Sequence, residues 1–174
     1  MADADLPQGD VGGTGPGTVP PTVAREMYDK WGSEYPATMK RWGYQTPEHI
    51  AQLAKEHSLM GTGGRVLDLA AGDGLSGVAL ASAGFDGEIT AVDLSPKLIE
   101  LARARNVYTE TLVADLNNLP LPFPSAAFRT VVCVGSLTYF APASGVVEEM
   151  VRLVRTYTPA RSSRLGSACN VVCY

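Results

Sequence analysis

The feature that most constrains the fold of this chain is the alternation of short apolar runs with amphipathic stretches between residues 65 and 155. The runs have the length and the β-branched content of buried strands, and the stretches between them have helical periodicity. The predicted strands are residues 65–70, 88–93, 110–114 and 129–134, and the predicted helices are residues 75–83, a segment opened by Ser95 and Pro96, and residues 143–155. Because parallel strands need crossover connections, this order predicts a three-layer α/β/α fold around a mostly parallel sheet.

The rest of the chain divides into segments of different composition. Residues 1–21 are rich in Gly, Pro and Asp, and we expect a disordered tail there. Residues 22–60 predict an N-terminal helical lid, with one helix that ends at Pro36 and a second that begins at Thr46. Residues 61–155 then form the predicted core, and residues 156–174 form an atypical tail whose last residues, 169–174, are one candidate for a fifth strand.

The bulk composition excludes several classes of protein. A net charge of −4 argues against a nucleic acid or an anionic membrane as the main partner. The N-terminus has no basic, apolar leader and the chain has no apolar run long enough to span a membrane, so we expect a cytoplasmic protein. The three cysteines favour neither a disulfide framework nor a metal site.

The chemistry is expected in the loop that follows the first strand. The sequence there reads VLDLAAGDG, in which Asp68 precedes a turn that contains Gly72 and Gly74. Glycine permits a tight turn and lets a ligand approach the backbone, and the following helix directs free N–H groups to the same place. In open α/β sheets, ligands bind beyond the carboxyl ends of the strands. The pattern therefore predicts a ligand site at this turn.

A nicotinamide dinucleotide is one candidate ligand. Gly72, Gly74 and Gly77 match the G-x-G-x-x-G fingerprint, and Asp93 follows at about the expected spacing of roughly 20 residues. Against it, the charge of Asp68 would repel a pyrophosphate but suits the cationic amino group of a methionine moiety. Asp115, just after the third strand, is the kind of acceptor that an adenine amino group needs.

Each of these carboxylates has an alternative role, and for Asp68 it is that of a solvated strand end. Asp93 can accept both hydroxyls of a ribose, or it can cap the helix opened by Ser95. Asp115 can accept from adenine, or it can serve as a turn residue before Asn117 and Asn118.

Four segments in this order resemble the motifs of class I S-adenosylmethionine-dependent methyltransferases. They read VLDLAAGDG, ITAVDLSPKLIELAR, VADLNNLPLPF and FRTVVCVGSLTYF, within residues 65–155. The lead-in YDKWGSEYPATMKRWGYQTPEHIAQL resembles that of the methyltransferase-like proteins of the Williams–Beuren syndrome region. The resemblance implies a Rossmann-like fold, S-adenosylmethionine as the cofactor and methyl transfer as the reaction.

The resemblance also assigns residues to parts of the cofactor. Asp68, Gly72 and Gly74 would hold the methionine end, and Asp93 would hold the ribose. The residues that would contact the adenine and the surroundings of the sulfonium are Leu94, Asp115 and Leu116 for the adenine, and Gly135 and Leu137 for the floor of the site. Tyr28, Trp31 and Tyr35 would either form part of a lid or pack their helices together.

The chain departs from the family pattern at two places. Ala70, which we also count among the cofactor-binding residues, stands where the family usually has glycine, and this is tolerable if the backbone there has a negative φ. Past residue 155 the usual Pro-Gly-Gly turn and three further strands are replaced by an unrelated tail. The fold would then lack the last strands of the family, and strand 129–134 would be a bare apolar edge prone to aggregation.

No residue identifies itself as a catalytic base. Tyr44 and His49 are conceivable, but packing or surface roles fit them as well. The methyl acceptor therefore stays open between a small molecule and a protein side chain. Three hypotheses remain: a methyltransferase, a nicotinamide-dependent oxidoreductase, and a cofactor-binding fragment without catalytic activity.

Overall fold

The computed structural model describes residues 20–56, 64–137, 140, 144–155 and 171–173. The elements, in chain order, are α1 (Pro21–Trp31), the short 3₁₀ helix η1 (Gly32–Glu34), α2 (Tyr35–Arg41), α3 (Thr46–Glu56), β1 (Arg65–Leu69), α4 (Leu75–Ser82), β2 (Glu88–Asp93), α5 (Pro96–Ala104), β3 (Glu110–Val113), β4 (Thr130–Cys133), α6 (Val146–Leu153) and β5 (Val171–Cys173). The predicted strand at 88–93 is confirmed residue for residue, and the other three predicted strands differ by one or two residues.

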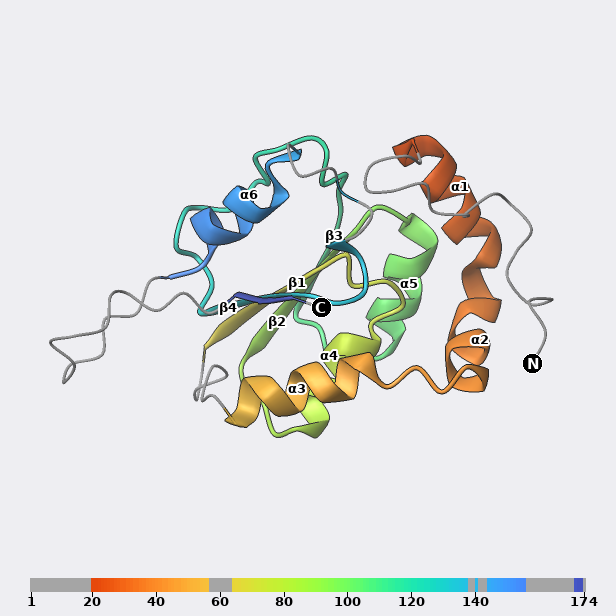
Figure 1. Ribbon diagram of the computed structural model, residues 1–174, viewed down its shortest axis with the longest axis horizontal. Helices are drawn as coiled ribbons and strands as arrows, with labels where there is room; N and C mark the ends of the chain where they lie inside the picture. The colour runs from red at the N-terminus through yellow and green to blue at the C-terminus, as the bar shows by residue number, and fades with distance from the viewer. Residues whose placement is uncertain (1–19, 57–63, 138–139, 141–143, 156–170, 174) are drawn as a thin grey trace, which may run out of the picture.

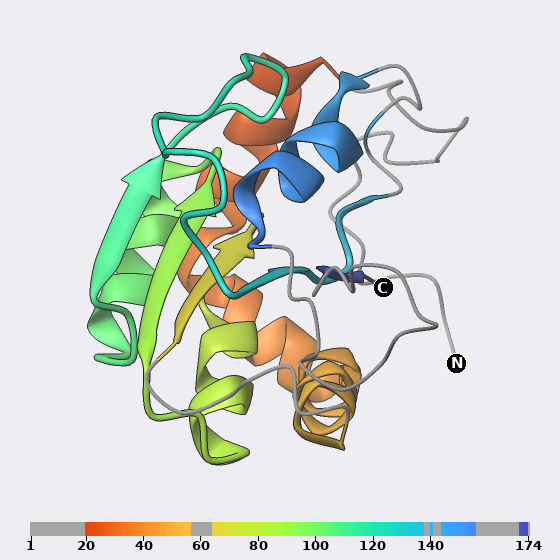
Figure 2. The same ribbon diagram turned by 90° about the vertical axis from the view of Figure 1, so that its left-hand side faces the viewer.

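The strands form one parallel sheet in the order β3-β2-β1-β4-β5. Figure 2 shows them side by side, from β3 at the left to β5, dark blue beside the C label. The expectation that residues 129–134 form a bare edge is wrong, because β5 pairs with β4 from Val131 opposite Val171 to Cys133 opposite Cys173. Both segments read Val-Val-Cys, a composition that favours strands.

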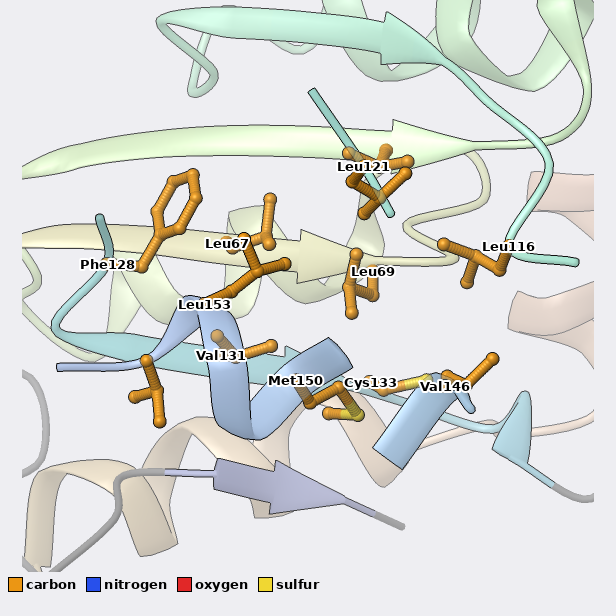
Figure 3. Packing of buried hydrophobic residues seen from close by; sticks show 12 residues of the cluster. Leu67, Leu69, Leu116, Leu121, Phe128, Val131, Cys133, Val146, Met150 and Leu153 are labelled. Carbon is orange, nitrogen blue, oxygen red and sulfur yellow. The ribbon is translucent and has the colours of Figure 1, made fainter. Parts of the chain in front are cut away.

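The sheet is covered on both faces, which confirms the predicted three-layer arrangement (Figure 1). Leu67 and Leu69 of β1 face α6. Val66 points to the opposite face of the sheet, toward α3 and α4, because side chains alternate along a strand. Figure 3 shows the α6 side, where Leu67, Leu69, Val131 and Cys133 meet Met150 and Leu153. Burial on both faces explains why β1 and β4 are mainly apolar, with Asp68 as a buried exception inside β1.

The N-terminal helices differ from the prediction at Pro36. That residue does not end the helical region but lies in the first turn of α2. Proline is tolerated there because the N–H that it lacks would have no partner within the helix. The turn falls earlier, at Gly32, which has a φ of +35°. Pro20 and Pro21 belong to the start of α1, so the expected tail of residues 1–21 overlaps the first helix, and residues 1–19 lie outside the described part.

Two helices expose apolar residues that helical spacing alone would bury. Leu53 of α3 is 44% exposed, whereas Ile50, Ala51 and Ala54 of the same helix are buried. In α6, Val147 and Val151 are more than half exposed, at 58% and 51%. The buried stripe of α6 is narrower than its run of apolar residues, because only one side of this short helix meets the sheet.

Candidate functional site

A cavity of about 290 Å³ lies at the carboxyl ends of the strands, between the core and the N-terminal helices. Seven of the ten residues predicted for the cofactor site line it, and they come from the ends of all four predicted strands: Ala70, Gly72, Asp93, Leu94, Asp115, Leu116 and Gly135. Asp68, Gly74 and Leu137 are not part of the wall. The chain thus brings residues from four sequence motifs to one hollow.

The glycine-rich turn forms the floor between β1 and α4. Gly72 has a φ of +58°, and a Cβ placed on it would meet no atom within 4 Å. Its N–H donates to the Asp93 Oδ2 at 2.8 Å. The open space beside Gly72 lies on the cavity side, so a ligand can reach the backbone there.

Ala70 does not have the negative φ expected for it, because its φ is +53°. The left-handed conformation costs an L-residue with a side chain about 1–2 kcal/mol. The turn therefore keeps the geometry that glycine would favour and tolerates the alanine methyl group at some cost.

Asp93 ends β2 with its carboxylate at the cavity. Oδ1 accepts from the Ser95 N–H at 2.9 Å and Oδ2 accepts from the Gly72 N–H at 2.8 Å. A carboxylate has about four acceptor positions, so about two remain beyond these contacts. Burial raises the pKa of this carboxyl. The helix cap is made by Ser95, whose Oγ accepts from the Leu98 N–H at 3.1 Å, so α5 does not depend on Asp93 for its cap.

Asp115 serves as a turn residue and also lies on the cavity wall. Its Oδ1 accepts from the backbone N–H and from the side-chain amide of Asn117, both at 2.8 Å, which makes it a turn residue. It also lines the cavity beside Leu116. The turn contacts fix the direction of the carboxylate, and they leave acceptor positions available to a ligand.

Asp68 lies behind the wall and not on it. Its side chain is fully buried, and Oδ2 accepts from the Ser76 hydroxyl at 2.5 Å and from the Tyr108 hydroxyl at 2.7 Å. Oδ1 is buried without a hydrogen-bond partner. Burial raises the pKa of Asp68 to about 6. In this structure it is Ser76 that lines the cavity, and Asp68 holds Ser76.

The N-terminal helices supply the outer wall. Tyr28 and Tyr35 line the cavity, whereas Trp31 does not. Trp31 packs against both, with ring centroids 6.1 Å from Tyr28 and 4.9 Å from Tyr35. The two tyrosines thus lie on the cavity wall and Trp31 packs their helices together, while a lid role for these residues stays a prediction.

Three residues near the site were missed or left undecided. Tyr108 and Arg105 contact the glycine-rich turn from outside, and no periodicity in the sequence marks them because they lie in the loop between α5 and β3. Tyr44 lines the cavity, and its hydroxyl is the nearest atom to a Cβ placed on Gly135, at 2.6 Å. His49 is exposed and lies off the cavity wall.

Sequence comparison identifies the family. Residues 66–156 match the family described as Methyltransferase domain. The chain is 31% identical to human Methyltransferase-like protein 27 over 126 residues, which are 68% of this chain and 49% of that protein. It is 26% identical to the Demethylmenaquinone methyltransferase of Tropheryma whipplei over 131 residues, 75% of this chain and 54% of that one. The chain thus spans about half the length of the curated relatives it matches.

Structural comparison agrees with the fold. A protein of Methanococcus maripaludis, proposed to be an S-adenosyl-L-methionine-dependent methyltransferase, superposes with a TM-score of 0.61 at 20% identity, over 74% of this chain and 60% of that one. At this identity the likeness speaks for the fold alone. No helix of the described residues is long and apolar enough to cross a membrane. The family match over the core and the similarity to human Methyltransferase-like protein 27, in agreement with the fold, show that the chain belongs to the class I S-adenosylmethionine-dependent methyltransferases.

Proposed function

We propose that this chain binds S-adenosylmethionine in the cavity at the carboxyl edge of the sheet and transfers its methyl group to a small-molecule acceptor. The observation that carries the proposal is the pairing of Asp93 with Gly72 on one wall. A buried carboxylate with acceptor positions to spare lies next to backbone that no side chain covers.

The residues present fit this cofactor. The carboxylate of Asp93 would hold the ribose hydroxyls, Asp115 would accept from the adenine amino group, and the turn at Gly72 would admit the methionine end. Leu94 and Leu116 offer apolar surface for the adenine ring. The cofactor, when bound, supplies an activated methyl group, and the protein contributes binding and alignment.

The chain's own residues would exclude water and orient the acceptor. Tyr28 and Tyr35 cover the cavity from the N-terminal helices, and Phe140 lines it from the side of β4. Tyr44 reaches the end of β4 beside Gly135. Its hydroxyl lies where it could contact an acceptor at that end, and we propose it in place of the exposed His49.

The aromatic side chains that line the cavity indicate the class of methyl acceptor. The cavity wall includes the rings of Tyr35, Tyr44 and Phe140, which favour a ring-bearing small molecule over an extended protein segment. The name of the Tropheryma whipplei relative, which refers to demethylmenaquinone, is in keeping with such an acceptor.

The replacement Asp93→Ala tests the site. We expect it to weaken the binding of S-adenosylhomocysteine by roughly 2–4 kcal/mol, because it removes up to two hydrogen bonds to a charged acceptor. Calorimetric titration of the purified chain measures this, with NAD as the ligand control. The matched variant is Asp86→Ala, which removes an exposed carboxylate just before the amino end of β2, away from the cavity. The dissociation constant of this variant should equal that of the unchanged protein.

Three outcomes would contradict the proposal. A folded chain that binds NAD and not S-adenosylhomocysteine would identify a nicotinamide-dependent protein. An unchanged dissociation constant in Asp93→Ala would remove Asp93 from the site. Binding without turnover on any ring-bearing acceptor would contradict the methyl-transfer step and would leave a cofactor-binding protein.

A further inference from the structure

The loop between α5 and β3 packs against the back of the glycine-rich turn. Two of its side chains, Arg105 and Tyr108, reach across 30 or more residues of sequence to residues 68–77. Neither lines the cavity, so neither is placed to touch a ligand. Their contacts bear on the geometry of the turn and not on the ligand itself.

The Tyr108 hydroxyl joins the end of β1 to the start of α4. It donates to the Asp68 Oδ2 at 2.7 Å and accepts from the Gly77 N–H at 3.1 Å. The first N–H groups of a helix have no partner within it, and the N-cap position of α4 is Gly74, which has no side chain to offer. Tyr108 therefore serves α4 as a cap supplied from a distant part of the chain.

The two glycines of α4's first turn and cap make room for this ring. A Cβ on Gly74 would lie 2.8 Å from the Tyr108 Cε2, and a Cβ on Gly77 would collide with the phenol. These glycines complete the G-x-G-x-x-G spacing that suggested a dinucleotide. In this structure their lack of a side chain is explained by Tyr108, which occupies the space above both.

Arg105 holds the middle of the same turn. Its Nε donates to the Asp73 carbonyl oxygen at 2.6 Å, and its guanidinium pairs with the Asp73 carboxylate. The Asp73 side chain is only 2% exposed, and the residue belongs to the cavity wall. The turn is thus held at two points, through Asp73 and through Asp68.

We propose that Tyr108 is a positioning residue, which holds the glycine-rich turn in the conformation that binds the cofactor by bridging Asp68 and the Gly77 N–H. The inference rests on the proposed function, because it assigns a role in binding the same ligand. It differs from that function in naming a residue outside the cavity on which the cavity depends.

The bridge makes ligand binding sensitive to the ionisation of Asp68. Burial raises the pKa of Asp68 to about 6, the hydrogen bonds from Ser76 and Tyr108 lower it, and the nearby charge of Asp93 raises it. The other charged groups at this turn are Asp73 and Arg105, which pair with each other. Above that pKa the carboxylate accepts from both hydroxyls; as the pH falls through about 6 it gains a proton and this anchor weakens. Affinity for the cofactor should fall with it.

The test compares Tyr108→Phe with Thr109→Val. The first removes only the bridging hydroxyl and keeps the ring above the two glycines. The second removes the neighbouring hydroxyl, which donates to the Ile89 carbonyl at 3.1 Å and does not touch the turn. Two quantities are measured: amide hydrogen exchange at Gly77 in the ligand-free protein by NMR, and the dissociation constant of S-adenosylhomocysteine between pH 5 and 8.

For Tyr108→Phe we expect faster exchange at Gly77, an affinity lower by about tenfold, and an acid midpoint of binding moved to higher pH. The midpoint rises because the lost hydrogen bond is one that lowers the pKa of Asp68. Thr109→Val should change none of these. If Tyr108→Phe binds with unchanged affinity and midpoint while the unaltered chain binds well, the positioning role is overturned. If the unaltered chain does not bind, the proposed function fails first, and the exchange at Gly77 still reports on the bridge.

Discussion

Ala70 is the residue at which side chain and backbone conflict most directly. Its φ of +53° favours glycine, yet it carries a methyl group at the cavity wall. We expect Ala70→Gly to raise the free energy of unfolding by about 0.5–1 kcal/mol, since relief of the strained φ outweighs the extra entropy of an unfolded glycine. Thermal unfolding followed by circular dichroism would show a melting temperature higher by about 2 °C.

The neighbouring position provides the control for this prediction. Ala71 is not among the residues with positive φ, so Ala71→Gly brings the entropy cost without the relief. It should lower the free energy of unfolding by about 0.5–1 kcal/mol. A decrease in both variants would mean that the loop relaxes around Ala70 and stores no strain there.

The chemistry of single residues could be predicted where it depends on strand ends. Asp93 ends one recognisable strand and Asp115 follows another. Parallel strands bring their carboxyl ends together, so the place of both residues beside the cavity follows from the pattern. The orientation of Asp68 could not be predicted in this way. It depends on Tyr108, whose position in space is fixed by the path of a loop and not by any periodicity.

Among the described residues, Asp29 joins helix α1 to the start of α5 through polar contacts. The Asp29 Oδ1 accepts from the Ser95 hydroxyl and, at 3.4 Å, from the Lys97 N–H at the start of α5. Because Tyr28 precedes Asp29 on this helix and lines the cavity, the contact also sets one part of the outer wall. Docking of the lid and closure of the site should therefore be coupled.

We expect Asp29→Ala to loosen this helix and to weaken S-adenosylhomocysteine binding by about fivefold. This corresponds to the loss of roughly 1 kcal/mol, the contribution of a half-exposed hydrogen bond to a charged group. Tryptic cleavage after Arg25 and Lys30 should become faster. Glu26→Ala, an exposed carboxylate on the same helix, is the control. Equal cleavage rates in the two variants would show that α1 is held by its aromatic contacts instead.

Among the elements, the buried ones could be predicted best. The strands β1, β2 and β4 are covered on both faces, so most of their residues are apolar or β-branched. Helix boundaries were harder to predict, because proline at 36 is compatible with the end of one helix and with the first turn of the next. Only the packing around Gly32 decides between them.

At the scale of the whole molecule, the strand–helix alternation predicts the layers and the parallel sheet. It does not predict β5, the fifth strand of that sheet. Val171–Cys173 is a run of three residues at the end of an atypical segment, too short for periodicity to separate it from a loop. Its place is set by β4, whose Val131 to Cys133 offer a free parallel edge with the same composition. Long-range pairing of this kind appears only in the folded chain.

The last strand is expected to protect the sheet from association. Val131, Val132 and Cys133 are fully buried, and without β5 their outer edge would present unpaired N–H and C=O groups. We expect a chain that ends after Asn170 to have a melting temperature about 5–10 °C lower. The decrease reflects the loss of roughly 3 kcal/mol of strand pairing and apolar contact. Light scattering at increasing protein concentration should show aggregates that the full chain does not form. The control is Val151→Ser, which removes an exposed apolar side chain of α6 and should change neither quantity. A shortened chain that melts and scatters like the full one would mean that the β4 edge is protected without β5.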